Sequence, residues 1–324
     1  MDFSLTDDQE LLRDTAHKLL DRECPPALVR AHIDDPAVYA PLWRHLSEYT
    51  ALGTGPATDL CLFLAETGYT AAPGPFLATA LYASLTGDED AIGSVAFVDD
   101  PVNSFVLEAD RVERIAIVGP GPGPGKTVAV VDTDGLGDRL RFVSTLDFSR
   151  RVFHLDTAGL DTTALAVDPH PLTPDAYAAW RDRAHVSIAA EMVGTARHIF
   201  DMTLAYAKER NQFDRPIGSF QAIQHKLADM SLALERATSA VQYGAMTVEA
   251  AAPESTLACH AAKAAAGEAA RRILKDGAQI HGGIGYTWEH DLHLYLRRAT
   301  ADEYLLGTTS WHLDRIADLL IVES

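Results

Sequence analysis

Residues 209–230 read ERNQFDRPIGSFQAIQHKLADM, and residues 279–299 read QIHGGIGYTWEHDLHLYLRRA. In the first stretch, the pattern predicts a long helix that ends near Arg210, then a Pro-Gly loop, then a second helix. Arg210, Phe213 and Gln221 are thereby gathered at one helix junction. There, a guanidinium, an aromatic face and an amide could bind a phosphorylated, ring-bearing ligand. In the structural alternative, Arg210 only caps the preceding helix.

The second stretch places three glycines directly after an Ala-rich helix. Gly282, Gly283 and Gly285 allow a left-handed turn and a close approach of the backbone to a ligand. Gln279 lies one turn before them. Each stretch alone is weak evidence, but the two together and in this order are specific.

The rest of the chain divides into three segments by its residue pattern. Residues 1–91 have helical periodicity that begins at a capping-box pair, Thr6 and Gln9. Residues 92–172 contain short strands rich in β-branched residues, separated by Gly, Asp and Pro, and residues 173–324 are helical again. The predicted fold is α+β and mostly α, with an N-terminal helical domain, a small central antiparallel β-domain and a C-terminal helical bundle.

The composition restricts the classes of partner. A formal net charge of −19 argues against nucleic acid and against anionic membrane surfaces, which require basic patches. The N-terminus is acidic where a signal peptide would be basic, and no apolar run approaches the roughly 18 residues of a membrane span. Cys24, Cys61 and Cys259 are far apart, which fits a reducing compartment. We expect a cytoplasmic protein with no membrane and no nucleic-acid partner.

Motifs for other chemistries are weak or missing. Residues 119–127, GPGPGPGKT, lack the first glycine of a phosphate loop because Pro120 stands there, and the prolines remove N–H donors. We expect a hairpin connection at this place. The thirteen histidines show no H-x-x-x-H or H-E-x-x-H spacing, so we expect no metal site. No G-x-S-x-G motif supports serine hydrolase chemistry.

Near the end of the chain, residues 303–311 read EYLLGTTSW. Gly307 can end one helix, and Thr308 or Thr309 can N-cap the next, whose apolar residues recur at helical spacing. On local grounds this stretch is a break between two helices.

These stretches together resemble the acyl-CoA dehydrogenase family, flavoenzymes that desaturate acyl-CoA thioesters between Cα and Cβ. The resemblance covers nearly the whole chain, from DFSLTDDQELLRDTAHKLLDRE through RNQFDRPIGSFQAIQHKLADM and QIHGGIGYT to LLGTTSW. It implies a helical domain, a β-domain and a four-helix bundle that drives dimer and tetramer assembly. It also implies contacts across a dimer to FAD, held mainly by the neighbouring subunit, for Arg210, Phe213, Gln221, Gln279, Gly282 and Gly283.

The catalytic base of the family has no match in this chain. Desaturation needs a carboxylate that removes the Cα proton while a hydride leaves Cβ for the flavin. The resemblance places this base at Leu306 or, in a subset of members, at Ala184, and neither side chain can accept a proton. Asp182 and Glu303 are near these positions in sequence but coincide with neither.

The β-region departs from the family as well. The family's T-E-P-x-A-G-S-D and W-I-T-N-G type strands have no counterpart between residues 92 and 150, and the chain is shorter than typical members. The pattern resembles the degenerate chain of actinobacterial α2β2 acyl-CoA dehydrogenases that act on CoA thioesters of steroid side chains. This implies a non-catalytic subunit that completes the FAD site of a longer catalytic partner chain and meets acyl-CoA through the complex.

Two alternatives stay open at this point. The first is an active homo-oligomeric enzyme with a relocated carboxylate base, either Asp182 or Glu303. The second is a structural or regulatory pseudoenzyme that contacts no flavin.

Overall fold

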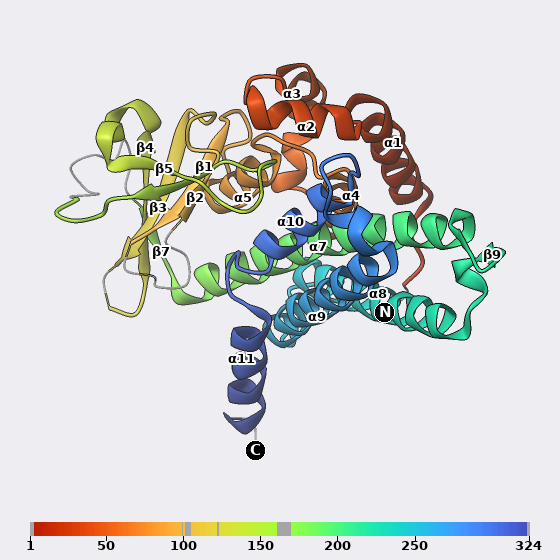
Figure 1. The fold of residues 1–324 in the computed structure, drawn as a ribbon. Coiled ribbons are helices and arrows are strands. Elements are labelled where there is room, and N and C mark those ends of the chain that lie inside the picture. Colours follow the sequence, from red (N-terminus) through yellow and green to blue (C-terminus); the bar gives the residue numbers. More distant parts are fainter. Residues whose placement is uncertain (1–2, 99, 101–104, 122, 161–169, 323–324) are drawn as a thin grey trace.

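The computed structural model describes residues 3–98, 100, 105–121, 123–160 and 170–322 (Figure 1). The first part of the chain is helical and begins at the predicted capping box, in which Thr6 and Gln9 each accept the backbone N–H of the other. No helix in these ranges is both long and apolar enough to cross a membrane. The helices of this part are α1 (Asp7–Glu23), α2 (Pro26–Asp34), α3 (Ala40–Leu46), the 3₁₀ helix η1 (Ser47–Gly53), α4 (Ala57–Tyr69) and α5 (Phe76–Thr86).

Strands occupy the middle of the chain and form two sheets, with the orders β1-β3-β4-β7 and β2-β6-β5. Among the described pairings, all but one are antiparallel, and β3 and β4 form the hairpin predicted at residues 119–127. The exception corrects the prediction: β1 and β3 run parallel, because β2 lies between them in sequence and pairs in the other sheet. The elements are β1 (Gly93–Phe97), β2 (Phe105–Leu107), β3 (Arg114–Pro120), β4 (Lys126–Asp132), the 3₁₀ helix η2 (Thr133–Arg139), β5 (Leu140–Val143), β6 (Val152–Leu155) and β7 (His170–Leu172).

The C-terminal part begins with the long helix α7 (Pro174–Glu209). Thr173 caps it by accepting the Ala176 N–H at 3.2 Å, and Pro174 takes the first helical position, where no N–H donor is needed. Figure 1 shows α7, α8 and α9 packed together, with α11 extending away from them. The other elements are β8 (Asn211–Gln212), β9 (Arg215–Pro216), η3 (Ile217–Ser219), α8 (Gln221–Glu249), α9 (Ser255–His281), η4 (Gly282–Tyr286), α10 (Leu292–Asp302) and α11 (Thr309–Val322).

Helices α4 and α7 cross in direct backbone contact. A Cβ atom at Gly68 would lie 2.0 Å from the Glu191 carbonyl oxygen, and one at Gly194 would lie 1.8 Å from the Ala65 carbonyl oxygen. Any side chain would therefore separate the two helices. Buried residues of the N-terminal helices and of the bundle belong to one continuous apolar core. The predicted boundaries after residues 91 and 172 agree with the change of element type and, as domain limits, stay predictions.

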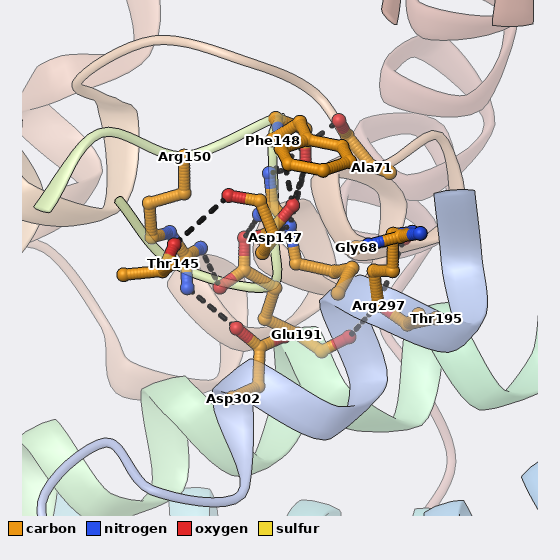
Figure 2. A network of polar contacts seen from close by, with 12 residues as sticks. Gly68, Ala71, Thr145, Asp147, Phe148, Arg150, Glu191, Thr195, Arg297 and Asp302 are labelled. Atoms are coloured by element: carbon orange, nitrogen blue, oxygen red, sulfur yellow. Dashed lines mark hydrogen bonds and ion pairs between the residues drawn. The ribbon is translucent and has the colours of Figure 1, made fainter. Parts of the chain in front are cut away.

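A buried polar network joins the sheet region to the bundle (Figure 2). Its centre is Arg298 of α10, which is 1% exposed. The guanidinium pairs with Asp147 Oδ2 at 2.8 Å and with Glu191 Oε1 at 3.0 Å, and it donates to the Ala72 carbonyl oxygen at 3.1 Å. Asp147 lies in the loop between β5 and β6, Glu191 lies in α7, and Ala72 follows α4. One side chain thus connects four parts of the fold.

Arg150, from the same loop as Asp147, extends the network toward α10. It pairs with Glu191 Oε2 at 2.6 Å and with Asp302 Oδ1 at 2.5 Å. The network therefore contains two guanidinium groups and three carboxyl groups. Burial raises the pKa of Asp302 to about 7, although Arg150 opposes this shift. The raised pKa means that Asp302 takes up a proton more readily than an ordinary aspartate, which lowers the cost of burying a third carboxyl group beside two arginines.

We expect the substitution Arg298→Ala to lower the free energy of unfolding by about 3–5 kcal/mol, because it leaves buried carboxylates without their partner. Urea titration followed by circular dichroism measures the change. Arg236→Ala is the matched control, since Arg236 is exposed and pairs with Glu268 on the surface; we expect a loss of no more than about 1 kcal/mol there. Equal losses for the two variants would contradict the central role of Arg298.

Candidate functional site

The connection between α7 and α8 is a short β-hairpin. Strands β8 and β9 pair, and Phe213 and Asp214 form the turn with φ angles of 54° and 61°. Two successive left-handed residues are typical of a type I′ turn, which normally selects Asn or Gly. Phe213 is nevertheless an aromatic residue there, and it is 87% exposed. The hairpin therefore presents an apolar ring to the surface at some backbone strain.

Arg210 and Gln221 lie on either side of this hairpin. The Arg210 N–H donates to the Tyr206 carbonyl oxygen at 2.9 Å, and the Arg210 carbonyl oxygen accepts from the Ile217 N–H at 2.8 Å. The backbone of Arg210 thus ends α7, whereas its exposed guanidinium makes no hydrogen bond or ion pair to any described residue. Gln221 is the first residue of α8, and its side chain is exposed as well.

The second predicted segment lies at the same end of the bundle. Gln279 Oε1 accepts a hydrogen bond from Lys226 Nζ at 2.7 Å, which holds the end of α9 beside the first turns of α8. Gly282 follows α9 with a φ of 64°, and a Cβ atom there would meet nothing within 4 Å. Gly283 is exposed beside it. All the predicted cofactor-binding residues are exposed: Arg210, Phe213 and Gln221 lie at the hairpin between α7 and α8, which carries the label β9 in Figure 1, and Gln279, Gly282 and Gly283 lie at the end of α9.

Leu306 lies in the turn between α10 and α11. Its φ is 53°, in the left-handed region that bulky residues rarely adopt, and Gly307 follows with a φ of 108°. Lys263 of α9 is fully buried and holds this turn in place. Its Nζ donates to the carbonyl oxygens of Asp302, Glu303 and Gly307 at 3.2–3.3 Å. The turn is thus a helix break, as predicted, and Lys263 anchors it to α9.

A small apolar cavity lies against Leu306. Its volume is about 60 Å³, whereas ligand sites usually measure about 300–1,000 Å³. None of the described residues that line it carries a carboxylate or an imidazole. They are Ala78, Leu81, Ser94, Val95, Phe97, Phe105, Leu107, Trp180, Ile188, Tyr304, Leu305 and Leu306. The cavity is thus smaller than a usual ligand site, and its described walls offer no strong base.

The other residues considered for the base also have structural surroundings. Ala184 is fully buried in α7. Asp182 Oδ2 accepts a hydrogen bond from Thr256 Oγ1 at 2.8 Å, and burial raises the pKa of Asp182 to about 6. Asp182 does not line the cavity beside Leu306. Its raised pKa reflects the desolvation of a buried carboxyl on another face of α7.

Glu303 acts as a cap for α11. Its carboxylate accepts the Thr309 N–H at 2.9 Å and the Thr309 hydroxyl at 3.0 Å. Thr308 Oγ1 accepts the Trp311 N–H at 3.3 Å, as the predicted hydroxyl cap. Both hydrogen bonds of Glu303 satisfy groups at a helix start, where a negative charge is also favoured by the helix dipole.

Sequence reasoning did not find two features of the bundle interior. Lys263 is a buried cation in an Ala-rich helix. In the sequence, a single lysine among apolar residues was the sign that could have indicated its burial. His185, His260 and His312 meet inside the bundle with ring nitrogens within 4.8 Å of one another, although no metal site was expected. Motif spacings describe ligands on one element, and these three residues come from α7, α9 and α11.

Residues 182–321 match the family description "Acyl-CoA dehydrogenase, C-terminal domain". The chain is also 32% identical, over 332 aligned residues, to the acyl-CoA dehydrogenase IpdE2 of Mycobacterium tuberculosis, and the alignment covers 96% of each chain. The chain belongs to the acyl-CoA dehydrogenase family. The family resemblance predicted from the sequence is therefore confirmed.

Two solved structures share this acyl-CoA dehydrogenase fold over nearly the whole chain. A variant of the Tcur3481-Tcur3483 steroid ACAD has a TM-score of 0.84 at 24% identity, with 98% of each chain covered. The ChsE4-ChsE5 complex from Mycobacterium tuberculosis has a TM-score of 0.85 at 22% identity, with 99% of each chain covered. These likenesses confirm the mostly helical α+β fold class.

We expect Glu303→Ala to lower the free energy of unfolding by about 1–2 kcal/mol, because it removes the charged acceptor for the first N–H of α11. Chemical denaturation measures the loss. Glu235→Ala, which removes an exposed carboxylate in the middle of α8, is the control and should change stability by less than about 0.5 kcal/mol. If Glu303→Ala were as stable as the control, the capping role would be wrong and Glu303 would be free for another role.

Proposed function

We propose that this chain is the non-catalytic subunit of an FAD-dependent heteromeric acyl-CoA dehydrogenase, and that it completes the flavin site of a longer catalytic chain. The observation that carries the proposal is Leu306. The position where the family keeps its proton-abstracting carboxylate holds a leucine, and that leucine faces an apolar cavity of about 60 Å³. Removal of a Cα proton needs a positioned base, and leucine has no group that could serve.

The two carboxylates near these positions support the same proposal. Glu303 is engaged by both the N–H and the hydroxyl of Thr309, and Asp182 is held by Thr256 on another face of α7. A relocated base would have to leave these partners and reach a cavity that neither residue lines. The homo-oligomeric enzyme with its own base is therefore the weaker alternative.

The exposed bundle end supports a role for this chain at a flavin bound by its partner. FAD, when bound, would supply the acceptor for the hydride. The Arg210 guanidinium is free among the described residues, and its planar set of donors suits a pyrophosphate. Phe213, at the tip of the hairpin, would pack against a flavin or adenine ring, and Gln221 would donate or accept hydrogen bonds from the start of α8. An exposed aromatic ring on a strained turn is more stable when a partner covers it.

The names of the structural relatives support a partner chain and suggest a substrate class. Both solved structures are named as pairs of gene products, and one is named a steroid ACAD. We infer an α2β2 assembly that acts on a bulky, steroid-derived acyl-CoA. A subunit that holds no substrate of its own leaves room for a large acyl group in the partner's site.

We expect Arg210→Ala to weaken FAD binding to the co-expressed complex by about 10–100-fold, because the loss of a charge-assisted hydrogen-bond pair is worth roughly 1.5–3 kcal/mol. Flavin release during dilution, followed by fluorescence, measures the affinity. Arg210→Lys should restore part of the FAD affinity, since lysine keeps the positive charge but lacks the planar set of N–H donors of a guanidinium.

Arg44→Ala is the control for this experiment, because Arg44 is an exposed arginine of α3 in the N-terminal part. It should leave FAD affinity unchanged. If Arg210→Ala behaved like Arg44→Ala, the contribution to the partner's flavin site would be wrong. A structural pseudoenzyme without flavin contact would then be the better account.

A further inference from the structure

Three histidines from three helices meet inside the C-terminal part of the molecule. His185 comes from α7, His260 from α9 and His312 from α11, and their side chains are 2%, 6% and 0% exposed. The ring centroids lie 4.8–5.0 Å apart in each pair, and one nitrogen of each ring lies within 4.8 Å of the others. The Trp311 ring packs against them. The cluster is therefore compact and shielded from water.

Hydrogen bonding inside the described part of the protein does not satisfy this cluster. The Nδ1 atoms of His260 and His312 lie 2.7 Å apart and share one hydrogen. His185 Nδ1 is buried without a hydrogen bond to any described residue, whereas the Leu306 backbone lies within hydrogen-bonding reach of the His312 ring. The contact of His185 Nε2 with Arg181 Nη2 is long, at 3.4 Å. Buried polar atoms are nearly always paired, so the unpaired His185 Nδ1, in a cluster with the facing Nδ1 atoms of His260 and His312, points to a ligand that completes the site.

We propose that His185, His260 and His312 bind a divalent transition-metal ion of the zinc class, each through one ring nitrogen, with water or an anion as the fourth ligand. Three imidazoles and one open position form an established type of zinc site in proteins. Nitrogen ligands about 2.0–2.1 Å from a tetrahedral ion lie about 3.3 Å apart. The two facing Nδ1 atoms would have to separate by about 0.6 Å, and the three ring nitrogens, which lie within 4.8 Å of one another, would have to settle at this common spacing by side-chain rotation.

The protonation state of the cluster fits this role. Burial, assisted by nearby cations, lowers the pKa of His260 to about 4 and lowers those of His185 and His312 as well, so all three rings are neutral at pH 7. Neutral imidazole is the form that binds metals. When the ion replaces the shared hydrogen, that proton moves to the other nitrogen of the same ring. All three rings stay neutral and no proton leaves the site.

Nearby charges determine the fourth ligand. Arg181 approaches His185, Lys263 lies close enough to lower the pKa of His312, and Arg315 lowers that of His260. These cations disfavour a bare dication and favour an anionic fourth ligand such as chloride or hydroxide. The consequence for the fold is a clamp, because the ion would tie α11, which extends from the bundle in Figure 1, to α7 and α9.

The full chain, purified with a chelator and then incubated with Zn²⁺ in chloride buffer, tests the proposal. After gel filtration, elemental analysis should find about one zinc ion per chain. Co²⁺ in place of Zn²⁺ should give the visible absorption bands of a tetrahedral site. His260→Gln and His312→Gln should each bind the metal at least tenfold more weakly, whereas His293→Gln, at a buried histidine of α10 outside the cluster, should bind it normally.

A second measurement needs no variant and so does not depend on variant folding. In the wild-type chain with ¹⁵N-labelled histidines, Zn²⁺ should shift one ring nitrogen in each of three histidines into the range of metal-bound nitrogens. Absence of these shifts, or metal uptake that His260→Gln and His312→Gln leave unchanged, would overturn the proposal. The cluster would then be a metal-free histidine pair packed against a third ring.

Discussion

The burial of two arginines among three carboxyl groups is the constraint on which the rest of the structure depends. Arg298 and Arg150 pair with Asp147, Glu191 and Asp302, and all five side chains are buried. Such charges are costly to desolvate, and they are tolerated only when every partner is in place. The network therefore positions the loop after β5, the end of α4, the middle of α7 and the last turn of α10 relative to one another. Of these elements, α7 also lines the cavity at Leu306, and the last turn of α10 leads directly into the turn that carries Leu306.

Buried polar contacts hold the turn after α10 in place. Asp302, at the start of the turn, belongs to the buried network through its ion pair with Arg150. Lys263 of α9 donates hydrogen bonds to three carbonyl oxygens of the turn. Leu306 is kept in a left-handed conformation by these contacts, and its side chain closes a small apolar cavity. The leucine side chain has no group that accepts a proton, in agreement with the proposed non-catalytic role. The strained hairpin at Phe213 differs from this turn, because the Phe213 side chain is exposed and its ring contact among the described residues is with Phe220.

Local signals in the sequence predicted much of this fold. The pairings between residues far apart in the chain could not be predicted from such signals. The Thr6 capping box, the helix junction at Arg210 and the break at Gly307 depend on neighbouring residues, and the structure has each of them. The parallel pairing of β1 with β3 was not predicted, because it depends on β2, which lies between them in sequence, pairing in the other sheet. The turn at Phe213 was missed because neither turn residue is the Gly or Asn that such turns select. The histidine cluster joins residues from three helices, so no spacing along the chain could reveal it.

The ratio of flavin to chains tests the central claim most directly. It is measured on this chain purified alone and on the complex purified after co-expression with a longer dehydrogenase chain, with FAD determined by absorbance and each chain by quantitative mass spectrometry. The account predicts no FAD on the chain alone, and a complex that contains both chains, fewer FAD molecules than chains and acyl-CoA-dependent dye reduction. A chain that purifies alone with one FAD per copy, and that reduces the dye without a partner, would contradict it.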